Sequence, residues 1–347
     1  MARDPNRTGA PTSAILHTMS SGSPNSAAPS RPPHCRPGVW PASLSPARLA
    51  SRIRTDAPAG CRVALLGLAD DLGVRLNAGR PGAAEGPAAI RAALARYGVA
   101  EPDDWAWPTI YDAGDVIPAP GTGPEALAQT HDRVTEAAGW LLDQGLFPIG
   151  LGGGHDLTFA FVRAAASRFP GLAGVSFDAH LDVRPEPGSG MVYRALIERC
   201  KVARVDVFGA NPLVNSAEHV RWFESHGGRL RSGHLDESDA ERNLPRLTKD
   251  FFVSFDLDVL DASHAPGVSA MNPAGWSTAT ATRMLLALAQ SPRLRCIDFM
   301  ELCPAHDPEG RTARVAAHML LTTLRGLHFR FMALDTPSKS RGEKDRS

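Results

Sequence analysis

Four short segments of the chain place histidine, aspartate and glutamate side chains at the ends of apolar runs. They read Gly-Gly-Gly-His-Asp at 152–156, Asp-Ala-His-Leu-Asp at 178–182, Asp-Leu-Asp at 256–258 and Glu-Leu-Cys-Pro at 301–304. One such segment alone is usually an ordinary polar loop. Together, the four supply enough imidazole nitrogen and carboxylate oxygen to hold two divalent ions in one cleft. The set therefore predicts a two-metal hydrolase.

Six of these residues are predicted to be metal ligands. A carboxylate can bridge two ions, so Asp178 and Asp256 are each predicted to serve both. One ion is then completed by His155 and Asp182, and the other by His180 and Asp258. Mostly oxygen ligation with one imidazole per ion suits manganese, although affinity alone does not exclude zinc, cobalt or iron. We therefore expect two Mn2+ ions per subunit.

Two acidic residues are predicted to be catalytic. Two ions that share a water lower its pKa, so that hydroxide forms near neutral pH and attacks the carbon of a C=N bond. The amine that leaves must be protonated, and Asp182 is placed to receive the proton of the water and pass it on. Glu301 is predicted to pair with a cationic nitrogen of the substrate.

The elements that position these residues are predicted from short apolar runs. Runs typical of strands buried on both faces lie at 63–67, 109–111, 147–151, 173–177, 205–208, 251–255 and 294–299. Helical patterns lie between them at 88–94, 124–144 and 157–168. This alternation predicts an α/β protein with three layers, α/β/α, around a mostly parallel sheet. Because ligands bind outside the carboxyl ends of parallel strands, the four segments are predicted to meet at one edge.

The chain is predicted to consist of one catalytic domain with two polar ends. Residues 1–58 are rich in Pro, Ser, Ala and Arg and show no sustained apolar period, so they are predicted to be mostly disordered. A mitochondrial presequence is the alternative, because the stretch is rich in Arg and Ser and poor in acids. The catalytic domain is predicted to span residues 59–335, and residues 336–347 form a polar tail.

Composition limits the partners and the compartment. Lys+Arg and Asp+Glu both number 37, so no net field favours nucleic acid or an anionic membrane as a partner. No run approaches the ~18 apolar residues of a membrane span, and the N-terminus lacks the apolar core of a secretory signal. The five cysteines are far apart and odd in number, which suits a reducing compartment. We therefore expect a cytoplasmic protein that acts on a small molecule.

The four segments resemble those of the arginase and agmatinase superfamily of ureohydrolases. Within it, the stretches at 73–87, 111–115, 265–270 and 311–313 are similar to formimidoylglutamase, an enzyme of histidine degradation that hydrolyses N-formimidoyl-L-glutamate to glutamate and formamide. The resemblance covers about residues 43–324. It implies an arginase-like fold, a binuclear manganese centre and a homo-oligomer.

The loop after the second segment carries the residues that bear on the substrate. Ser189 stands where arginases and agmatinases commonly carry a catalytic histidine, whereas formimidoylglutamases resemble the Ser-Gly form. Arg184 also fits that form and is predicted to bind a substrate carboxylate bidentately. With Glu301, these two make up the predicted substrate-binding set. The chain departs from the usual pattern at Asp156, where Glu is more common, and at Cys303, where Asn is more common.

Two alternative functions stay open at this stage. One is a ureohydrolase that releases urea from arginine, agmatine or another guanidino acid. The other is a catalytically silent binding or regulatory protein that keeps the fold. The hypothesis of a silent protein predicts that a metal ligand or a proton-transfer residue is missing, whereas all six metal-ligand positions are filled. Release of urea or of formamide distinguishes the two hydrolases.

Overall fold

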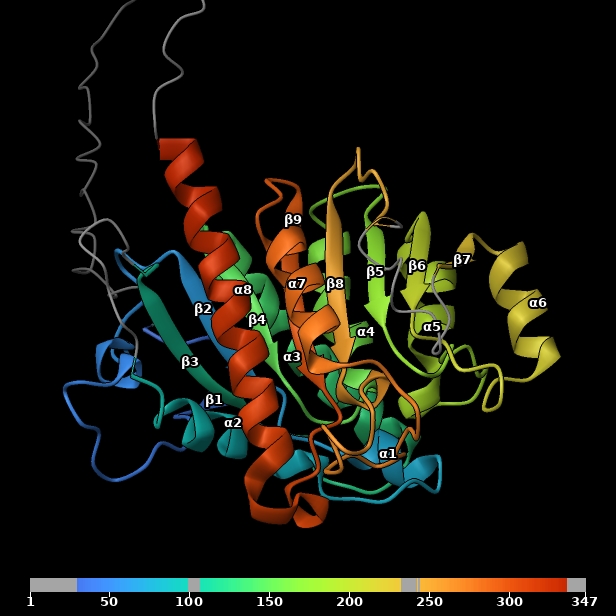
Figure 1. Ribbon diagram of the computed structural model, residues 1–347, viewed down its shortest axis with the longest axis horizontal. Helices are drawn as coiled ribbons and strands as arrows, with labels where there is room; N and C mark the ends of the chain where they lie inside the picture. Colours follow the sequence, from blue (N-terminus) through green and yellow to red (C-terminus); the bar gives the residue numbers. More distant parts are fainter. Residues whose placement is uncertain (1–29, 99–106, 232–241, 243, 336–347) are drawn as a thin grey trace, which may run out of the picture.

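A nine-stranded sheet lies at the centre of the structure, a computed structural model that describes residues 30–98, 107–231, 242 and 244–335 (Figure 1). The strands are β1 (Cys35–Arg36), β2 (Val63–Gly67), β3 (Ile110–Val116), β4 (Phe147–Leu151), β5 (Ala173–Phe177), β6 (Arg204–Phe208), β7 (Gly228–Leu230), β8 (Phe251–Asp256) and β9 (Leu294–Met300). Their order is β1-β3-β2-β4-β9-β8-β5-β6-β7, and only the β1–β3 pair is antiparallel. Each predicted strand is present, and β1 and β7 are additional.

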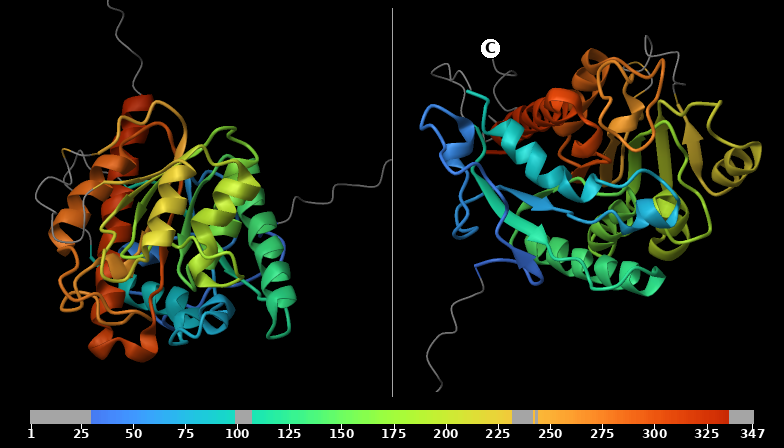
Figure 2. Two further views of the ribbon diagram at one scale, coloured as in Figure 1. Left: turned by 90° about the vertical axis from the view of Figure 1, so that its right-hand side faces the viewer. Right: turned by 90° about the horizontal axis from the view of Figure 1, so that it is seen from below.

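Helices cover both faces of the sheet, which confirms the predicted α/β/α architecture (Figures 1 and 2). One face carries α2 (Gly86–Leu94), α7 (Thr278–Ala289) and α8 (Arg311–Asp335). The other carries α3 (Pro124–Asp143), α4 (Asp156–Ala166) and α5 (Val192–Cys200), while α6 (Ala217–Ser225) contacts β7. Short α1 (Leu72–Leu76) lies near the carboxyl ends of the strands. Within the described ranges, no helix combines the length and apolarity needed to cross a membrane.

Six single turns of 3-10 helix connect the described elements. They are η1 (Leu49–Arg52), η2 (Ala83–Glu85), η3 (Ser189–Met191), η4 (Leu257–Val259), η5 (Pro304–His306) and η6 (Pro308–Gly310). Of these, η4 contains Asp258 of the third predicted metal segment, and η3 contains Ser189, so these two polar residues lie in turns rather than in extended strands.

Continuous apolar runs form the strands because each strand is buried on both faces. In β2, Val63 and Leu65 belong to the core under α2, α7 and α8, whereas Ala64 and Leu66 belong to the core under α3, α4 and α5. All four side chains are fully buried. Successive side chains of a strand point to opposite faces, so a strand with two buried faces needs apolar residues at every position.

The four predicted segments follow four adjacent strands in the middle of the sheet. The strands β4, β9, β8 and β5 are neighbours in that order. Their carboxyl ends lead into His155, Glu301, Asp256 and Asp178. After β5 the chain passes through α5 on one face to β6, and after β8 it passes through α7 on the other face to β9. The adjacent strands β5 and β8 thus lead in opposite directions, and such a change in winding direction opens a crevice at the carboxyl edge. Residues far apart in the sequence therefore meet there.

Residues 30–58 differ from the predicted disordered extension. Strand β1 pairs antiparallel with β3, and Leu49 and Ile53 are buried in the core beside α2. The indole N–H of Trp40 donates to Asp112 Oδ2 over 2.5 Å. These few apolar residues pack against the edge of a sheet that the rest of the domain forms. The segment is therefore held in place without a repeating apolar pattern of its own. Residues 1–29 of the predicted extension and the predicted tail, 336–347, lie outside the described residues.

Candidate metal centre

The glycine turn after β4 brings His155 to the centre. The turn passes so close to the backbone at residues 68–70 that a Cβ on Gly153 would lie 2.1 Å from Leu68 O. Only glycine permits this approach. His155 directly precedes α4, and its backbone N–H donates to Glu301 Oε1 over 2.7 Å. This bond links the first and fourth segments, and the His155 ring is buried beside them.

A first group of donor atoms surrounds His155. Its Nδ1 lies 2.8 Å from Asp182 Oδ2, 3.2 Å from Asp256 Oδ2 and 3.3 Å from Asp178 Oδ2. Donor atoms of His155, Asp178 and Asp256 all lie within 4.8 Å of one another, close enough to hold one metal ion. The Asp182 carboxylate lies at the same nitrogen. The structure therefore brings together all four residues predicted around this ion.

A second group shares Asp178 with the first. His180 Nδ1 lies 2.9 Å from Asp258 Oδ2 and 3.6 Å from Asp178 Oδ1. The two oxygens of Asp178 thus face two different histidines, as a bridging carboxylate requires. Asp256 differs from the predicted arrangement, because it belongs to the first group alone. Its Oδ1 accepts a hydrogen bond from the Asp258 backbone N–H at 2.9 Å, which turns that oxygen toward η4.

Crowding of buried carboxylates shifts the pKa values of the centre. Burial, then the charge of Asp182, raises the pKa of Asp178. Burial, then Asp258, raises the pKa of Asp256. Burial raises the pKa of Glu301 to about 8. Divalent ions relieve this repulsion by taking the place of protons, so metal binding releases protons.

The donor set fits manganese. Asp178 Oδ2 is buried and has no hydrogen-bond partner, although His155 Nδ1 lies 3.3 Å away. A buried carboxylate oxygen with no donor is stable only if a cation or a proton satisfies it. Two imidazole nitrogens among an excess of carboxylate oxygens match the preference of Mn2+ over thiolate-binding metals.

Two residues of the centre have a backbone conformation that is uncommon outside glycine. The φ angle is +42° at Asp182 and +66° at Glu301. Such left-handed residues carry strain and concentrate at functional sites. The Tyr193 backbone N–H donates to Asp182 O over 3.0 Å and so holds this turn. A turning loop rather than an extended strand thus aims Asp182 at the centre.

A buried polar chain behind His155 was not predicted. His155 Nε2 lies 3.1 Å from Ser254 Oγ, and the Ser254 hydroxyl donates to Asp298 Oδ1 over 2.7 Å. Since the one hydroxyl proton goes to Asp298, Ser254 accepts from the Nε2–H of His155. That tautomer leaves the lone pair on Nδ1, toward the carboxylates, where a metal ligand needs it. Ser254 precedes Asp256 by two positions, and this spacing is the signal that could have revealed it.

We expect Ser254→Ala to weaken metal binding at His155 by about 10–100-fold, the usual effect of losing a residue that orients a ligand. Binding at His180 should change little, because Ser254 does not contact it. Calorimetric titration of the metal-free protein with Mn2+ measures both steps. Ser167→Ala is the matched control, because the Ser167 hydroxyl donates to Ala164 O in α4 and accepts from Arg168 Nη1, neither of which is a metal ligand. Equal affinities in the two variants would exclude an orienting role.

A sequence model of the arginase family matches residues 61–325 of the chain. The chain belongs to the arginase family. Its match to the formimidoylglutamase of Aromatoleum aromaticum is 36% identical over an alignment of 297 residues, and it covers 76% of this chain and 82% of that protein. The match to the formimidoylglutamase of Geobacillus thermodenitrificans is 32% identical over an alignment of 283 residues, and it covers 77% of this chain and 84% of that protein. The predicted family resemblance is thus confirmed.

A solved structure shares the fold of this arginase-family chain. The Trypanosoma cruzi formiminoglutamase, crystallised with two Mn2+ ions, superposes with a TM-score of 0.73 at 29% identity. The match covers 82% of this chain and 99% of that protein. The two chains therefore share one fold over nearly the whole length of the trypanosomal enzyme.

The two remaining predicted substrate residues of this arginase-family chain lie together in the loop before α5. The Arg184 backbone N–H donates to Gly190 O over 2.8 Å, and Asn77 Oδ1 accepts from Gly190 N at 2.8 Å and from Ser189 Oγ at 3.5 Å. The Arg184 side chain is exposed and forms no ion pair with a described carboxylate. No hydrogen bond joins Arg184 or Ser189 to the six predicted ligands. Asn77, which fixes this loop, was not predicted.

The two departures from the family pattern pack against the loop at 73–82. The Asp156 carboxylate pairs with His131 over 2.8 Å, and a Cβ on Gly73 would lie 1.9 Å from Asp156 Oδ1. The Cys303 thiol donates to Pro81 O over 3.2 Å. Both side chains are buried, and neither lies among the metal ligands. Their effect on the centre is therefore indirect, through the position of this loop.

Proposed function

We propose that the chain is a binuclear manganese hydrolase that converts N-formimidoyl-L-glutamate and water to L-glutamate and formamide. The observation that carries this proposal is the position of Asp178, whose two oxygens face His155 and His180 in two adjoining donor groups. The curated relatives above are formimidoylglutamases, and the trypanosomal relative was crystallised with two Mn2+ ions. These matches support the substrate, and the donor groups support the metal.

We propose that the predicted residues hold the two ions as the donor groups suggest. His155, Asp182 and Asp256 hold one ion, His180 and Asp258 hold the other, and Asp178 serves both. When bound, the two ions supply a water acidified enough to act as a nucleophile near neutral pH. The side chains around the two ions perform the remaining chemistry, which is proton transfer and substrate orientation.

Asp182 is suited to move the proton. Its side chain is 15% exposed, whereas those of Asp178, Asp256 and Asp258 are 0%, 3% and 5% exposed. It is thus the ligand carboxylate with most access to a substrate. We propose that Asp182 accepts the proton of the attacking water and donates it to the leaving nitrogen, so that glutamate departs as a neutral amine before it is protonated by solvent.

Glu301 is suited to hold the formimidoyl group. Because burial raises the pKa of its carboxyl to about 8, the ionised form is stabilised by a nearby cation. A protonated formimidoyl nitrogen provides that cation. The bond from the His155 backbone N–H occupies Oε1 of Glu301 and fixes the orientation of the carboxylate. We propose that Oε2 pairs with the substrate through a charge-assisted hydrogen bond.

The product that is released tests this function. We expect the manganese-loaded protein to release formamide from formimidoylglutamate, and to release no urea from arginine or agmatine. Serine at 189 supports this choice, because a serine hydroxyl cannot shuttle protons near neutral pH as an imidazole does. Assays for formamide, urea and ammonia on one substrate panel decide the question. Urea from a guanidino acid, with formimidoylglutamate untouched, would replace this proposal with the ureohydrolase.

We expect Arg184→Ala to raise KM for formimidoylglutamate by about 10–100-fold, since hydrogen bonds to a charged group contribute about 1.5–3 kcal/mol. The kcat and the metal content should stay near those of the wild type, because the residue binds the substrate carboxylate and not the ions. Arg184→Lys should recover only part, because an ammonium lacks the planar fork. Arg221→Ala, which removes an exposed arginine of α6, is the control. An unchanged KM in Arg184→Ala would remove Arg184 from the substrate site.

We also propose that the protein is a cytoplasmic homo-oligomer without a nucleic-acid partner. The five cysteines are all free, as suits a reducing compartment, and equal numbers of acidic and basic residues create no net attraction to nucleic acid. The oligomer follows from the family resemblance alone. Sedimentation of the purified chain measures it directly, and a single species at the monomer mass would contradict it.

A further inference from the structure

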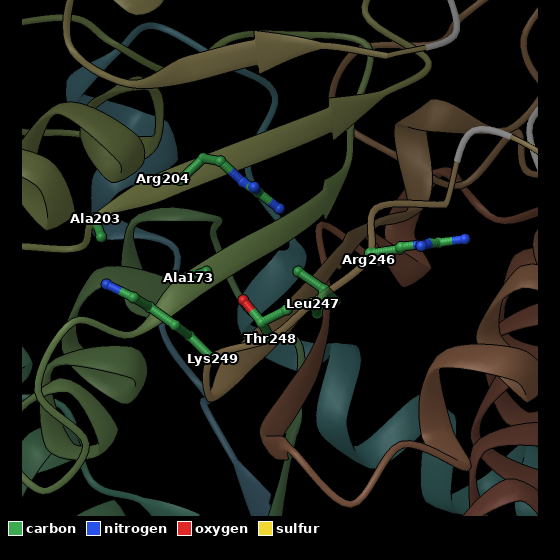
Figure 3. Close-up of a pocket in the computed structure, with 7 residues that line it drawn as sticks. All are labelled: Ala173, Ala203, Arg204, Arg246, Leu247, Thr248 and Lys249. Atoms are coloured by element: carbon green, nitrogen blue, oxygen red, sulfur yellow. The ribbon is translucent and has the colours of Figure 1, made fainter.

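A second hollow lies at the amino edge of the sheet, opposite the metal centre. It has a volume of about 230 Å3 and is lined by Arg204, Arg246, Leu247, Thr248, Lys249 and two alanines (Figure 3). Arg204 is the first residue of β6, and one of the alanines, Ala173, is the first of β5. The predicted metal ligands follow the last residues of β4, β5 and β8. The length of the strands therefore separates the two sites.

Among the described residues, three cations and no carboxylate line this hollow. Figure 3 shows Arg204 extending from β6 toward the segment of Leu247 and Thr248, while Arg246 and Lys249 leave that segment on either side. Arg246 and Lys249 are exposed, and neither pairs with a carboxylate in the part of the chain that the structure describes. Both side chains are long and flexible, so they are able to turn toward a ligand in the hollow.

The two acidic residues beside the hollow are already paired. Asp206 lies between two arginines, with Oδ2 2.6 Å from Arg204 Nε and Oδ1 2.5 Å from Arg231 Nε. Asp250, next to Lys249 in the sequence, pairs with Arg295 over 2.6 Å. One carboxylate cannot neutralise two guanidiniums, so the group around Asp206 keeps a net positive charge. Among the described residues, positive charges therefore outnumber negative charges around the hollow, in a protein whose formal net charge is zero.

Further cations lie along this edge of the sheet. Arg330 donates to the carbonyl of Leu294, the first residue of β9, over 2.9 Å. Burial, followed by the charges of Arg295 and Arg62, lowers the pKa of Arg330 to about 10. Burial by itself disfavours the charged guanidinium, so the shift reflects desolvation first and the two neighbouring arginines second.

The backbone amides of the two alanines are already used. The N–H of Ala173 donates to Asp250 O at 2.9 Å, and the N–H of Ala203 donates to Leu172 O at 2.9 Å. The side-chain donors around the hollow are the three cations and the Thr248 hydroxyl. Cations and a hydroxyl donate charge-assisted hydrogen bonds to oxyanions, and these bonds are about twice as strong as neutral ones.

We propose that this hollow binds a small anion with at least two negative charges, separate from the substrate of the metal centre. The three cations around the hollow repel one another. A dianion offsets more of this repulsion than a singly charged chloride ion does. A tetrahedral oxyanion and a short dicarboxylate both carry the required charge and oxygen acceptors, and both fit the volume. The site does not depend on which amidine the metal centre hydrolyses.

Calorimetric titration of the manganese-loaded protein with sulfate, and separately with succinate, tests the site. We expect at least one of the two to bind, and the affinity to fall at least about tenfold in Arg246→Ala/Lys249→Ala, because each substitution removes a charge-assisted contact. Tighter binding of succinate identifies a dicarboxylate site, and tighter binding of sulfate identifies an oxyanion site. Sodium chloride at matched ionic strength should give no comparable heat.

A control variant separates local binding from net charge. Arg96→Ala/Arg221→Ala removes the same two charges from exposed positions that do not line the hollow, so it should keep the wild-type affinity. Thermal unfolding in chloride checks that both double variants are folded. The proposal is overturned if the wild type binds neither anion, or if Arg246→Ala/Lys249→Ala keeps the wild-type affinity for both.

Discussion

Asp178→Asn is expected to abolish hydrolysis and to lower the metal content from two ions per subunit toward one or none. Asparagine has the size and shape of aspartate, so the packing around this buried residue is retained while its charge is lost. The two oxygens of Asp178 face His155 and His180, so the substitution weakens both ions at once. Since metal ions contribute several kcal/mol of transition-state stabilisation, the loss in rate should exceed about 10³-fold.

Metal analysis of the dialysed protein, together with the hydrolysis assay, measures both effects. Asp143→Asn is the matched control, because that carboxylate pairs with Arg168 at the surface of α3, where an ion pair contributes little. His180→Ala, by contrast, should weaken mainly the ion beside Asp258 and leave the ion beside His155. Two tightly bound ions in Asp178→Asn would contradict the proposed ligand scheme.

The sequence predicted the strands well because each is short, apolar and buried on both faces. It did not predict β1, which has two residues and exists only through its pairing with β3. Helices α7 and α8 were also missed. The α7 segment is rich in threonine, whose branched side chain lowers helix propensity. The α8 helix packs against both α2 and α7, so its apolar residues spread over a broad arc and the helical period is blurred.

The predicted metal residues share one property that can be read from the sequence, which is that each lies at or just beyond the end of an apolar run. Ser254 and Asp298 instead lie inside β8 and β9, two residues before the strand ends. Their hydrogen bond depends on the register of β8 against β9, where these two residues are direct partners although 44 positions apart in sequence. Register between strands brought together by a long crossover is set by tertiary packing, which the sequence of either strand alone does not encode. The same holds for Asn77, which acts on a loop 113 positions away.

Arg91→Ala is expected to destabilise the protein by about 3–5 kcal/mol, the usual result of removing one partner from a buried ion pair. Arg91 is fully buried in α2. Its Nε and Nη2 donate to the two oxygens of Asp112 at 2.9 Å each, and Nη1 donates to Asp115 Oδ1 at 2.5 Å. Without the guanidinium, two carboxylates of β3 stay buried with no cation. The loss is a large fraction of the stability of an ordinary domain.

Urea unfolding at equilibrium measures this loss as a lower midpoint with an unchanged slope. Arg54→Ala, which breaks an exposed pair with Asp56, is the control and should shift the midpoint little.

Replacing the whole group, as Arg91→Leu/Asp112→Asn/Asp115→Asn, should recover part of the stability, because the cost comes from uncompensated charge rather than from lost packing. The N-terminal segment should loosen first in Arg91→Ala, since Trp40 bonds to Asp112 and Gly38 packs on the Arg91 guanidinium. Arg91→Ala with the midpoint of the wild type would show that the two carboxylates find other partners.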